Sequence, residues 1–409
     1  MNFLANTTTS INTCVQDSHL LSELILNCEP LNRILDGKNI SEQEAFEIFQ
    51  IAENNPTELF QTSQILRKKY KRNIVSFSKK AFFNLINLCK DTCSYCTYKA
   101  EPEESKLSLM SKNDVHKMLL LAKKYRCTEA LFVTGERPEQ KYDEAKIWLR
   151  SNGFSTTAEY LVYVSELALA NGLFPHTNAG NLTKKEMQEL QKSNPSMGLM
   201  LENVSERLTK KGMPHYLASS KKPKDRLQVL QNAGELGLPM TTGLLIGIGE
   251  TYREIIESIF AIKNLNDKFT NIQEVILQNF QPKPDTMMND FQSADENYFK
   301  SVVALTRIVM PEMNIQIPPN LSPRSYQSFL SVGINDWGGI SPLTPDYVNP
   351  EFSWPAISEV DEYSQNAGFK LECRFPVYPE FFSFLSLELR EKLAVLENEN
   401  GYVREEYWK

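Results

Sequence analysis

The sequence lacks an excess of positive charge, and this absence limits the partners of the protein. Its 409 residues include 44 lysine and arginine residues against 51 aspartate and glutamate residues, which gives a formal net charge of −7. Proteins that bind nucleic acid neutralise backbone phosphates with clustered basic side chains. We therefore expect no DNA or RNA partner.

Long apolar runs are also missing. No stretch reaches the 18 or so apolar residues of a membrane-spanning helix, and residues 1–13 are polar, without the charged and apolar regions of a secretory leader. We therefore expect no membrane association and a cytoplasmic location.

The seven cysteines do not form the even set of a disulfide framework. Four are scattered, and we interpret them as small core residues: Cys14, Cys28, Cys127 and Cys373. The other three, Cys89, Cys93 and Cys96, fall within eight residues. In a reducing compartment such a cluster is first a candidate for metal binding or catalysis, because its thiols stay free to act as ligands.

From residue 81 onward, short apolar segments alternate with longer amphipathic ones, which predicts an α/β fold of six or seven βα units around a parallel sheet. The predicted strands are 82–86, 130–134, 173–178, 197–201, 242–246, 274–279 and 315–317. The predicted helices are 112–124, 157–170, 184–192, 224–236, 252–264 and 294–308. Right-handed crossovers would curl these units into a full or partial barrel, with the catalytic loops at the carboxyl ends of its strands.

The segments that flank this pattern have a different character. Residues 1–75 are expected to form a helical lead-in, in which Ser41 and Glu44 form a capping box. Residues 76–320 would form the barrel, and residues 321–409 would form a C-terminal extension that caps it.

The three clustered cysteines have the spacing C-x3-C-x2-C in the segment NLCKDTCSYCTYK, directly after the first predicted strand. Three thiolates can hold three corners of a 4Fe-4S cubane and leave one iron open to a small molecule. The alternatives are a structural zinc site or three unrelated core cysteines. A structural zinc site needs four ligands. The next candidates along the chain, His116 and Cys127, are not at the ligand spacing of zinc fingers.

This spacing, with Tyr95 just before the last cysteine, resembles the signature of the radical S-adenosylmethionine (SAM) superfamily. The resemblance implies a partial (βα)6 barrel similar to a TIM barrel, with a 4Fe-4S cluster on Cys89, Cys93 and Cys96. It also implies that the open iron chelates SAM, that reductive cleavage releases a 5'-deoxyadenosyl radical, and that Tyr95 lies against the adenine.

Three further loops resemble the parts of that superfamily that hold SAM. Gly135 and Glu136, in FVTGER, would bind the amino group, although a tight turn with a helix-capping glutamate explains them equally well. Gly247, in GLLIGIGE at 243–250, would let the backbone approach the adenine. Glu202 would accept the ribose hydroxyls, and a solvent-exposed glutamate at a helix start is the alternative.

Longer strings resemble one family, subunit 1 of 7,8-didemethyl-8-hydroxy-5-deazariboflavin (FO) synthase, over residues 76 to 380. They are TGERPE at 134–139, HTNAG at 176–180, SMGLMLE at 196–202, IQEVILQNFQPK at 272–283 and GINDWGGISPLT at 333–344. The resemblance implies a radical SAM lyase that cyclises 5-amino-5-(4-hydroxybenzyl)-6-(D-ribitylimino)-5,6-dihydrouracil to FO and releases ammonia. Another radical SAM enzyme, such as the partner subunit or a menaquinone-pathway synthase, and a non-catalytic metal-binding protein are the alternatives.

The same resemblance implies two protein partners besides the small-molecule substrate. A second FO synthase subunit, itself a tyrosine-using radical SAM protein, would make the substrate, because this chain has only one cysteine triplet. A low-potential electron donor would reduce the cluster.

Neutral amide side chains follow several predicted strands and suit a polyhydroxylated ligand that resembles uracil. The candidates for substrate binding are Asn178, Gln278, Asn279, Asn320 and Asn335. We expect His176 and Asp336 to transfer protons and Trp337 to help cap the site. Asparagine and aspartate also shape loops, so a structural role is the alternative for each.

Overall fold

The protein is described by a computed structural model that covers residues 28–409. The polar start, Cys14 and the first part of the predicted helical lead-in lie outside the described residues. Within residues 28–409, none of the helices combines the length and the apolar character that crossing a bilayer would require.

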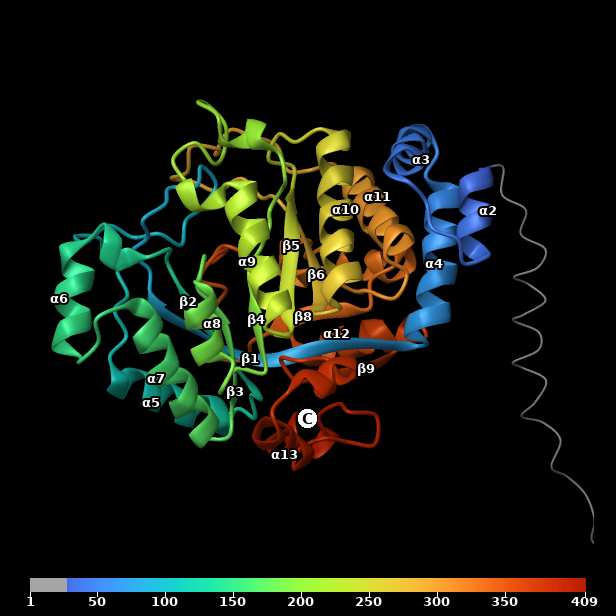
Figure 1. Cartoon of the computed structure of the whole chain (residues 1–409). Helices are drawn as coiled ribbons and strands as arrows, with labels where there is room; N and C mark the ends of the chain where they lie inside the picture. Colours follow the sequence, from blue (N-terminus) through green and yellow to red (C-terminus); the bar gives the residue numbers. More distant parts are fainter. Residues whose placement is uncertain (1–27) are drawn as a thin grey trace, which may run out of the picture.

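Eight parallel strands form a closed barrel (Figure 1). They are β1 (Ile74–Ile86), β2 (Glu129–Thr134), β3 (Phe174–Asn178), β4 (Ser196–Gly198), β5 (Met240–Ile246), β6 (Ile272–Asn279), β7 (Asn314–Gln316) and β8 (Asp336–Ile340). Each strand pairs with the next, and β1 closes the ring by pairing with both β2 and β8. The strands are buried on both faces, as expected for a parallel sheet covered by helices.

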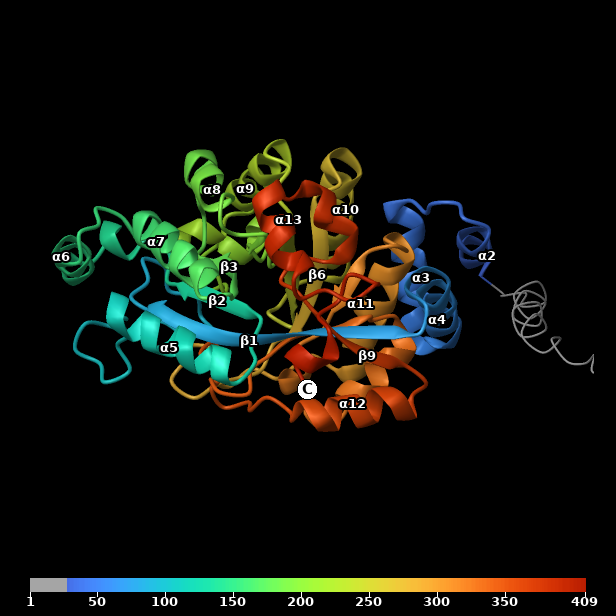
Figure 2. The ribbon, with the colours of Figure 1, turned by 90° about the horizontal axis from the view of Figure 1, so that it is seen from below.

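Strand β1 is long enough to take part in two pairings on one side. Its residues 80–86 pair with β2, whereas its first half pairs in parallel with a ninth strand, β9 (Lys370–Arg374), outside the ring. Figure 2 shows β1 running the width of the molecule, with β9 and α12 (Ile357–Asn366) at one end.

Helices surround the ring on its outer face. They are α5 (Lys112–Lys124), α6 (Asp143–Ser151), α7 (Thr157–Ala170), α8 (Lys184–Leu190), α9 (Pro223–Glu235), α10 (Tyr252–Phe269) and α11 (Glu296–Val309). Capping boxes start four of the helices, and the one at Ser41 and Glu44 is among them, as predicted. The described part of the lead-in forms α2 (Glu29–Leu35), α3 (Glu42–Asn54) and α4 (Thr57–Lys71), which lie beside α10 and α11 (Figure 1).

The α/β barrel fold is confirmed, and all seven predicted strands are present, but the barrel is closed rather than partial. The eighth strand, DWGGI, was not predicted because its two glycines are typical of a loop. Trp337 of β8 belongs to the wall of the barrel, where it lines the interior, and does not cover its mouth. Its indole is fully buried, contacts Tyr326 edge to face, and donates to Ser364 Oγ of α12.

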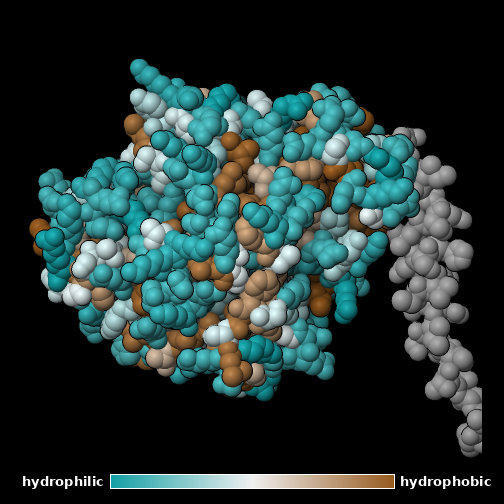
Figure 3. Space-filling view, viewed as in Figure 1, coloured by the Kyte–Doolittle hydropathy of each residue, from teal (hydrophilic) through white to brown (hydrophobic). Residues whose placement is uncertain are grey.

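The C-terminal part also contains α13 (Leu387–Ala394), which lies at the amino ends of the strands. Cys127 and Cys373 are buried in the core, as predicted, whereas Cys28 is only half-buried. The outer face seen in Figure 3 is mostly hydrophilic, and apolar side chains show between the helices.

Candidate active site

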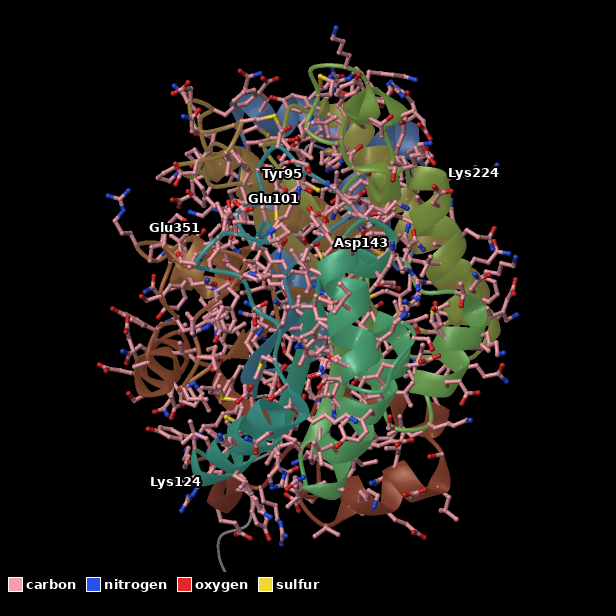
Figure 4. All side chains as sticks on the ribbon, turned by 90° about the vertical axis from the view of Figure 1, so that its left-hand side faces the viewer. Tyr95, Glu101, Lys124, Asp143, Lys224 and Glu351 are labelled. Carbon is pink, nitrogen blue, oxygen red and sulfur yellow. The ribbon has the colours of Figure 1, made fainter. Side chains whose placement is uncertain are left out.

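The cysteine loop lies at the carboxyl end of the barrel. In Figure 4, Tyr95 of this loop lies towards one end of the molecule, and Lys124, at the end of α5, lies at the other. The loop is held by backbone hydrogen bonds to two other loops. Lys90 N–H donates to the Glu136 carbonyl at 2.8 Å, and Thr92 N–H donates to the Leu217 carbonyl at 2.8 Å.

The three thiols of this loop are close enough to influence one another. Burial is the main reason that the pKa of Cys89 rises to about 11, and Cys96 raises it further. Burial, with Cys96 and Cys89 as neighbours, also raises the pKa of Cys93. Without a metal, burial favours the neutral thiols. A bound metal favours the thiolates instead, because its positive charge stabilises them.

The spacing of the thiols is not that of a single-ion site. Nowhere in residues 28–409 do three His, Cys, Asp or Glu side chains gather closely enough to hold one metal ion. A 4Fe-4S cluster instead takes one thiolate at each of three separate corners, so its ligands lie farther apart. Three half-buried cysteines on one loop therefore fit such a cluster.

Some of the buried polar atoms without a hydrogen-bond partner lie at or just after the carboxyl ends of β2, β3 and β4, and others are scattered over the described residues. Those near the strand ends are Thr134 Oγ1, Asn181 Oδ1, Glu202 Oε2 and Asn203 Nδ2. Buried polar groups are almost always paired, so unpaired ones at the mouth of the barrel are available to a ligand. The ammonium, carboxylate and hydroxyl groups of SAM are suitable partners.

Two glycines bring Glu136 against the cysteine loop. A Cβ at Gly135 would lie 2.0 Å from the Leu88 carbonyl oxygen and 2.8 Å from Cys89 Cα, so only glycine fits. Gly180 has φ +72°, and a Cβ there would lie 2.1 Å from Glu136 Oε2. The Glu136 N–H in turn donates to Cys89 Sγ at 3.2 Å.

Glu202 is held in a conformation that few glutamates adopt. Its φ is +66°, in the left-handed region, which costs of order 1–3 kcal/mol that the surrounding structure must offset. One carboxylate oxygen pairs with Lys221, and the other has no partner. Burial would raise its pKa, but Lys221 and Arg226 outweigh burial and hold the pKa below its usual range. The side chain is therefore a charged acceptor with one free oxygen.

Tyr95 and the end of β5 share one apolar cluster, with Leu245 and Ile248 among its members. The Tyr95 hydroxyl lies 3.0 Å from His215 Nε2. Gly247, between the two apolar residues, has φ +94° and allows the sharp turn after β5. The structure thus brings together Tyr95 and the GLLIGIGE segment, both predicted to contact adenine.

A cavity opens inside the barrel, lined by residues of most of its strands. Its ionisable and amide side chains are Lys80, Glu129, His176, Asn178, Glu274, Gln278, Gln316, Asp346, Asn349 and Arg374. Apolar side chains, among them Phe82, Leu131 and Trp354, form the rest of the wall. A concave site with apolar walls and several polar groups suits a small organic substrate.

Three of the predicted substrate and proton-transfer residues reach this cavity: His176, Asn178 and Gln278. Two others lie outside it. Asn279 donates to the Leu321 carbonyl at 2.9 Å, and Asn320 donates to Asp346 Oδ2 at 3.0 Å.

Asn335 and Asp336 also lie outside the cavity. Asn335 directly precedes β8 and Asp336 begins it, so both sit at the amino end of the barrel. The Asn335 amide accepts from Arg307 at 2.8 Å. Asp336 is fully buried and pairs with Arg374 at 2.7 Å. The structure does not bring these two residues to the cavity with His176.

Sequence reasoning missed the charged residues of the inner wall, such as Lys80, Glu129, Glu274 and Arg374. A signal was present in the first three, because each is a charged residue within an otherwise mostly apolar strand: KKAFFNLI, EALFVT and IQEVILQ. A charge in a strand buried on both faces needs a partner or a function.

The hydrogen bonds of His176 define its tautomer. Ser196 Oγ donates to the Pro376 carbonyl, which can only accept. The same hydroxyl lies 2.7 Å from His176 Nδ1, so it accepts a hydrogen bond from Nδ1–H. Nε2 therefore carries a lone pair. Burial is the main reason that the pKa of His176 falls to about 4, so the imidazole is neutral at pH 7.

The lowered pKa of His176 predicts a loss of stability in mild acid. Below pH 6.5 the unfolded chain binds a proton at this residue, and the folded protein does not until about pH 4. The free energy of unfolding therefore falls through this window. We expect the fall to be about 1–3 kcal/mol smaller in His176→Gln, measured by urea denaturation. The matched control is His116→Gln, at an exposed position, and an equal effect of both variants would contradict the assignment.

Comparison with known proteins agrees with this geometry. Residues 83–262 match the family model of the Radical SAM superfamily. The FeFe-hydrogenase maturase HydG from Carboxydothermus hydrogenoformans superposes with a TM-score of 0.68 at 19% identity, over 93% of this chain and 91% of that one. Methylornithine synthase (PylB) gives 0.59 at 16% identity, over 87% and 96%. The fold and the cysteine loop are those of a radical SAM barrel, a class that uses a 4Fe-4S cluster and SAM.

Closer relatives define the family. The 7,8-didemethyl-8-hydroxy-5-deazariboflavin synthase of Methanopyrus kandleri is 42% identical over 334 residues, which cover 81% of this chain and 100% of the relative. That of Methanocaldococcus jannaschii is 42% identical over 83% of this chain and 93% of the relative. The FO synthase of Streptomyces coelicolor is 41% identical over 81% of this chain but only 40% of its own length. The chain belongs to the 7,8-didemethyl-8-hydroxy-5-deazariboflavin synthase family.

Proposed function

We propose that this protein closes the deazaflavin ring. It converts 5-amino-5-(4-hydroxybenzyl)-6-(D-ribitylimino)-5,6-dihydrouracil to FO and releases ammonia, which makes it a carbon–nitrogen lyase. The observation that carries this proposal is the match to the whole length of a relative with that name. The polar cavity inside the barrel, at whose carboxyl end the cysteine loop lies, supports it.

The residues at the mouth of the barrel divide into two sets. Cys89, Cys93 and Cys96 hold the cluster, and Tyr95, Gly135, Glu136, Glu202 and Gly247 contact SAM. When bound, these cofactors supply a 5'-deoxyadenosyl radical that removes a hydrogen atom from the substrate. The free oxygen of Glu202 would accept from a ribose hydroxyl, and the Glu136 carboxylate would accept from the ammonium group.

The cavity residues bind and orient the substrate. Asn178 and Gln278 offer amide donors and acceptors that match uracil carbonyls and ribityl hydroxyls. His176 presents a lone pair at Nε2 and accepts a proton as the new ring becomes aromatic. Enclosure by the barrel keeps water away from the radical.

Two further proteins take part in this proposal. The chain matches 40% of the S. coelicolor FO synthase. In this proposal, a second radical SAM subunit that uses tyrosine makes the substrate. A low-potential donor reduces the cluster. The reaction is therefore one half of a two-part synthesis.

The proposal is tested by anaerobic reconstitution with iron and sulfide, followed by SAM, dithionite and the purified aminouracil substrate. We expect 5'-deoxyadenosine and a fluorescent deazaflavin in equal amounts, together with ammonia. Deoxyadenosine without deazaflavin would retain the radical chemistry and overturn the ring-closing activity. Protein without iron and sulfide serves as the blank.

A further inference from the structure

Lys80 of β1 extends its side chain across the inner wall of the barrel. It passes directly over Gly339 of β8, where an added Cβ would lie 2.2 Å from Lys80 Cδ and 2.6 Å from its Nζ. The side chain lines the cavity, and the residue is only 9% exposed. The glycine of β8 therefore makes room for a lysine that reaches the substrate space.

The ammonium group of Lys80 has no hydrogen-bond acceptor among the described residues. Two aromatic faces lie near it, with Nζ 4.9 Å from the Trp354 ring centroid and 5.6 Å from that of Phe82. The adjacent Lys79 points the other way and donates to the Trp408 carbonyl at 2.7 Å. A buried ammonium without an acceptor is costly, so its partner is best sought in the ligand.

Other charged groups face Lys80 from several strands. Glu129 of β2, Asp346 after β8 and Glu274 of β6 favour its charged form, and Arg374 of β9 opposes it. Burial outweighs the attraction and lowers the pKa of Lys80, so this ammonium releases a proton more readily than an exposed lysine. His176 lies in the same field, since Glu129 and Lys80 also act on its pKa. The cavity thus contains a candidate acid, Lys80, and a candidate base, His176.

We propose that Lys80 is a catalytic residue whose ammonium gives a proton to the amine that leaves the substrate. This inference rests on the proposed ring-closing function. After the radical step, the bond from carbon to the amine breaks and its electron pair stays on nitrogen. That nitrogen takes a proton from Lys80 Nζ and departs as ammonia.

The electron pair of a neighbouring carbon–hydrogen bond then forms the new double bond, and the proton of that bond goes to His176 Nε2. Lys80 is left neutral and His176 protonated. Return of one proton from His176 to Lys80 through the cavity restores both, so the elimination itself balances in atoms and charge. The unpaired electron left by the radical step is lost in a separate one-electron oxidation, for which an oxidised iron–sulfur cluster held by the cysteine loop would be the acceptor.

The test separates cleavage of SAM from loss of the amine. In single turnovers of the reconstituted enzyme, we expect Lys80→Met to form deoxyadenosine at close to the normal rate. Deazaflavin should form about 100-fold more slowly, the usual contribution of a general acid, while a product that retains the amine accumulates in the mass spectrum. Lys79→Met is the matched control and should keep the normal ratio of deazaflavin to deoxyadenosine.

Chemical rescue and a second variant distinguish a loss of proton transfer from a structural effect of the Lys80 substitution. Ethylamine and methylamine should restore deazaflavin formation in Lys80→Ala, with a dependence on amine pKa. Gly339→Ala has an ordinary backbone conformation and displaces Lys80 without removing it, so it should reproduce the defect and add nothing to Lys80→Met.

Three results would overturn the role of Lys80: a normal product ratio in Lys80→Met, absence of amine rescue, or additive effects of the two substitutions. Failure of the unmodified enzyme to make deazaflavin would instead overturn the proposed function.

Discussion

Replacing Cys93 with alanine is expected to abolish both deoxyadenosine and deazaflavin formation. Cys93 is the middle residue of the triplet, and its thiol interacts electrostatically with both Cys89 and Cys96. Two remaining thiolates leave two corners of the cubane without a protein ligand, so the cluster is lost or cannot pass an electron to SAM. The measurement is product formation by chromatography after anaerobic reconstitution.

The matched control for this variant is Cys127→Ala. Cys127 is also a free cysteine, but it is buried in the hydrophobic core and away from the loop. We expect a modest loss of stability and a full yield of deoxyadenosine per reconstituted cluster. Normal activity of Cys93→Ala would refute the assignment of the cluster ligands.

The second large effect is expected on stability, from Arg374→Met. Arg374 Nε lies 2.7 Å from Asp336 Oδ2 and its Nη2 lies 2.8 Å from Glu274 Oε1. All three side chains are at most 5% exposed. Removing the cation leaves two carboxylates buried without their partner, which costs about 3–5 kcal/mol of unfolding free energy.

Urea denaturation at pH 7 measures this cost. The control is Arg390→Met, which breaks a pair with Glu397 in which the arginine is 35% exposed, and it should cost about 1 kcal/mol or less. The difference in unfolding free energy between wild type and Arg374→Met should become smaller as the pH falls, because burying a protonated carboxyl group costs less free energy than burying a carboxylate. An equal, small cost for both variants would show that the buried network is not needed.

Periodicity and turn residues were enough to predict most of the barrel. The seven predicted strands all exist, and the longer ones, such as β2 and β5, are apolar runs bounded by turn residues. The eighth strand contains Gly338 and Gly339, so its sequence is typical of a loop. Both positions are glycine because neighbouring side chains inside the barrel leave no room for a Cβ. A Cβ at Gly338 would collide with Gln316, and one at Gly339 with Lys80. Such crowding is a tertiary property that local sequence does not reveal.

Because β8 was not predicted, two of the predicted site residues were expected at the wrong end of the barrel. Asn335 was predicted to bind the substrate and Asp336 to transfer protons, because both were expected at the barrel mouth. Asp336 instead begins β8 and Asn335 directly precedes it, so both lie at the opposite end from the cysteine loop. By contrast, His176 and Asn178 lie on β3, which was predicted correctly, and both reach the cavity.

The inner wall could be predicted only in part. A charged residue in an apolar strand, such as Lys80 or Glu129, marks a special environment, but pairing depends on strands far apart in the chain. Arg374 reaches Asp336 and Glu274 only because β9 pairs beside β1. Sequence alone does not give that pairing, since β9 follows α12 and is far from β1 along the chain.

The most direct test of this account is electron paramagnetic resonance of the reduced, reconstituted protein with and without SAM, together with iron and sulfide analysis. The account predicts about four iron and four sulfide per chain and a spectrum that changes when SAM binds the open iron. One zinc per chain without sulfide, or a cluster spectrum that SAM leaves unchanged, would contradict it.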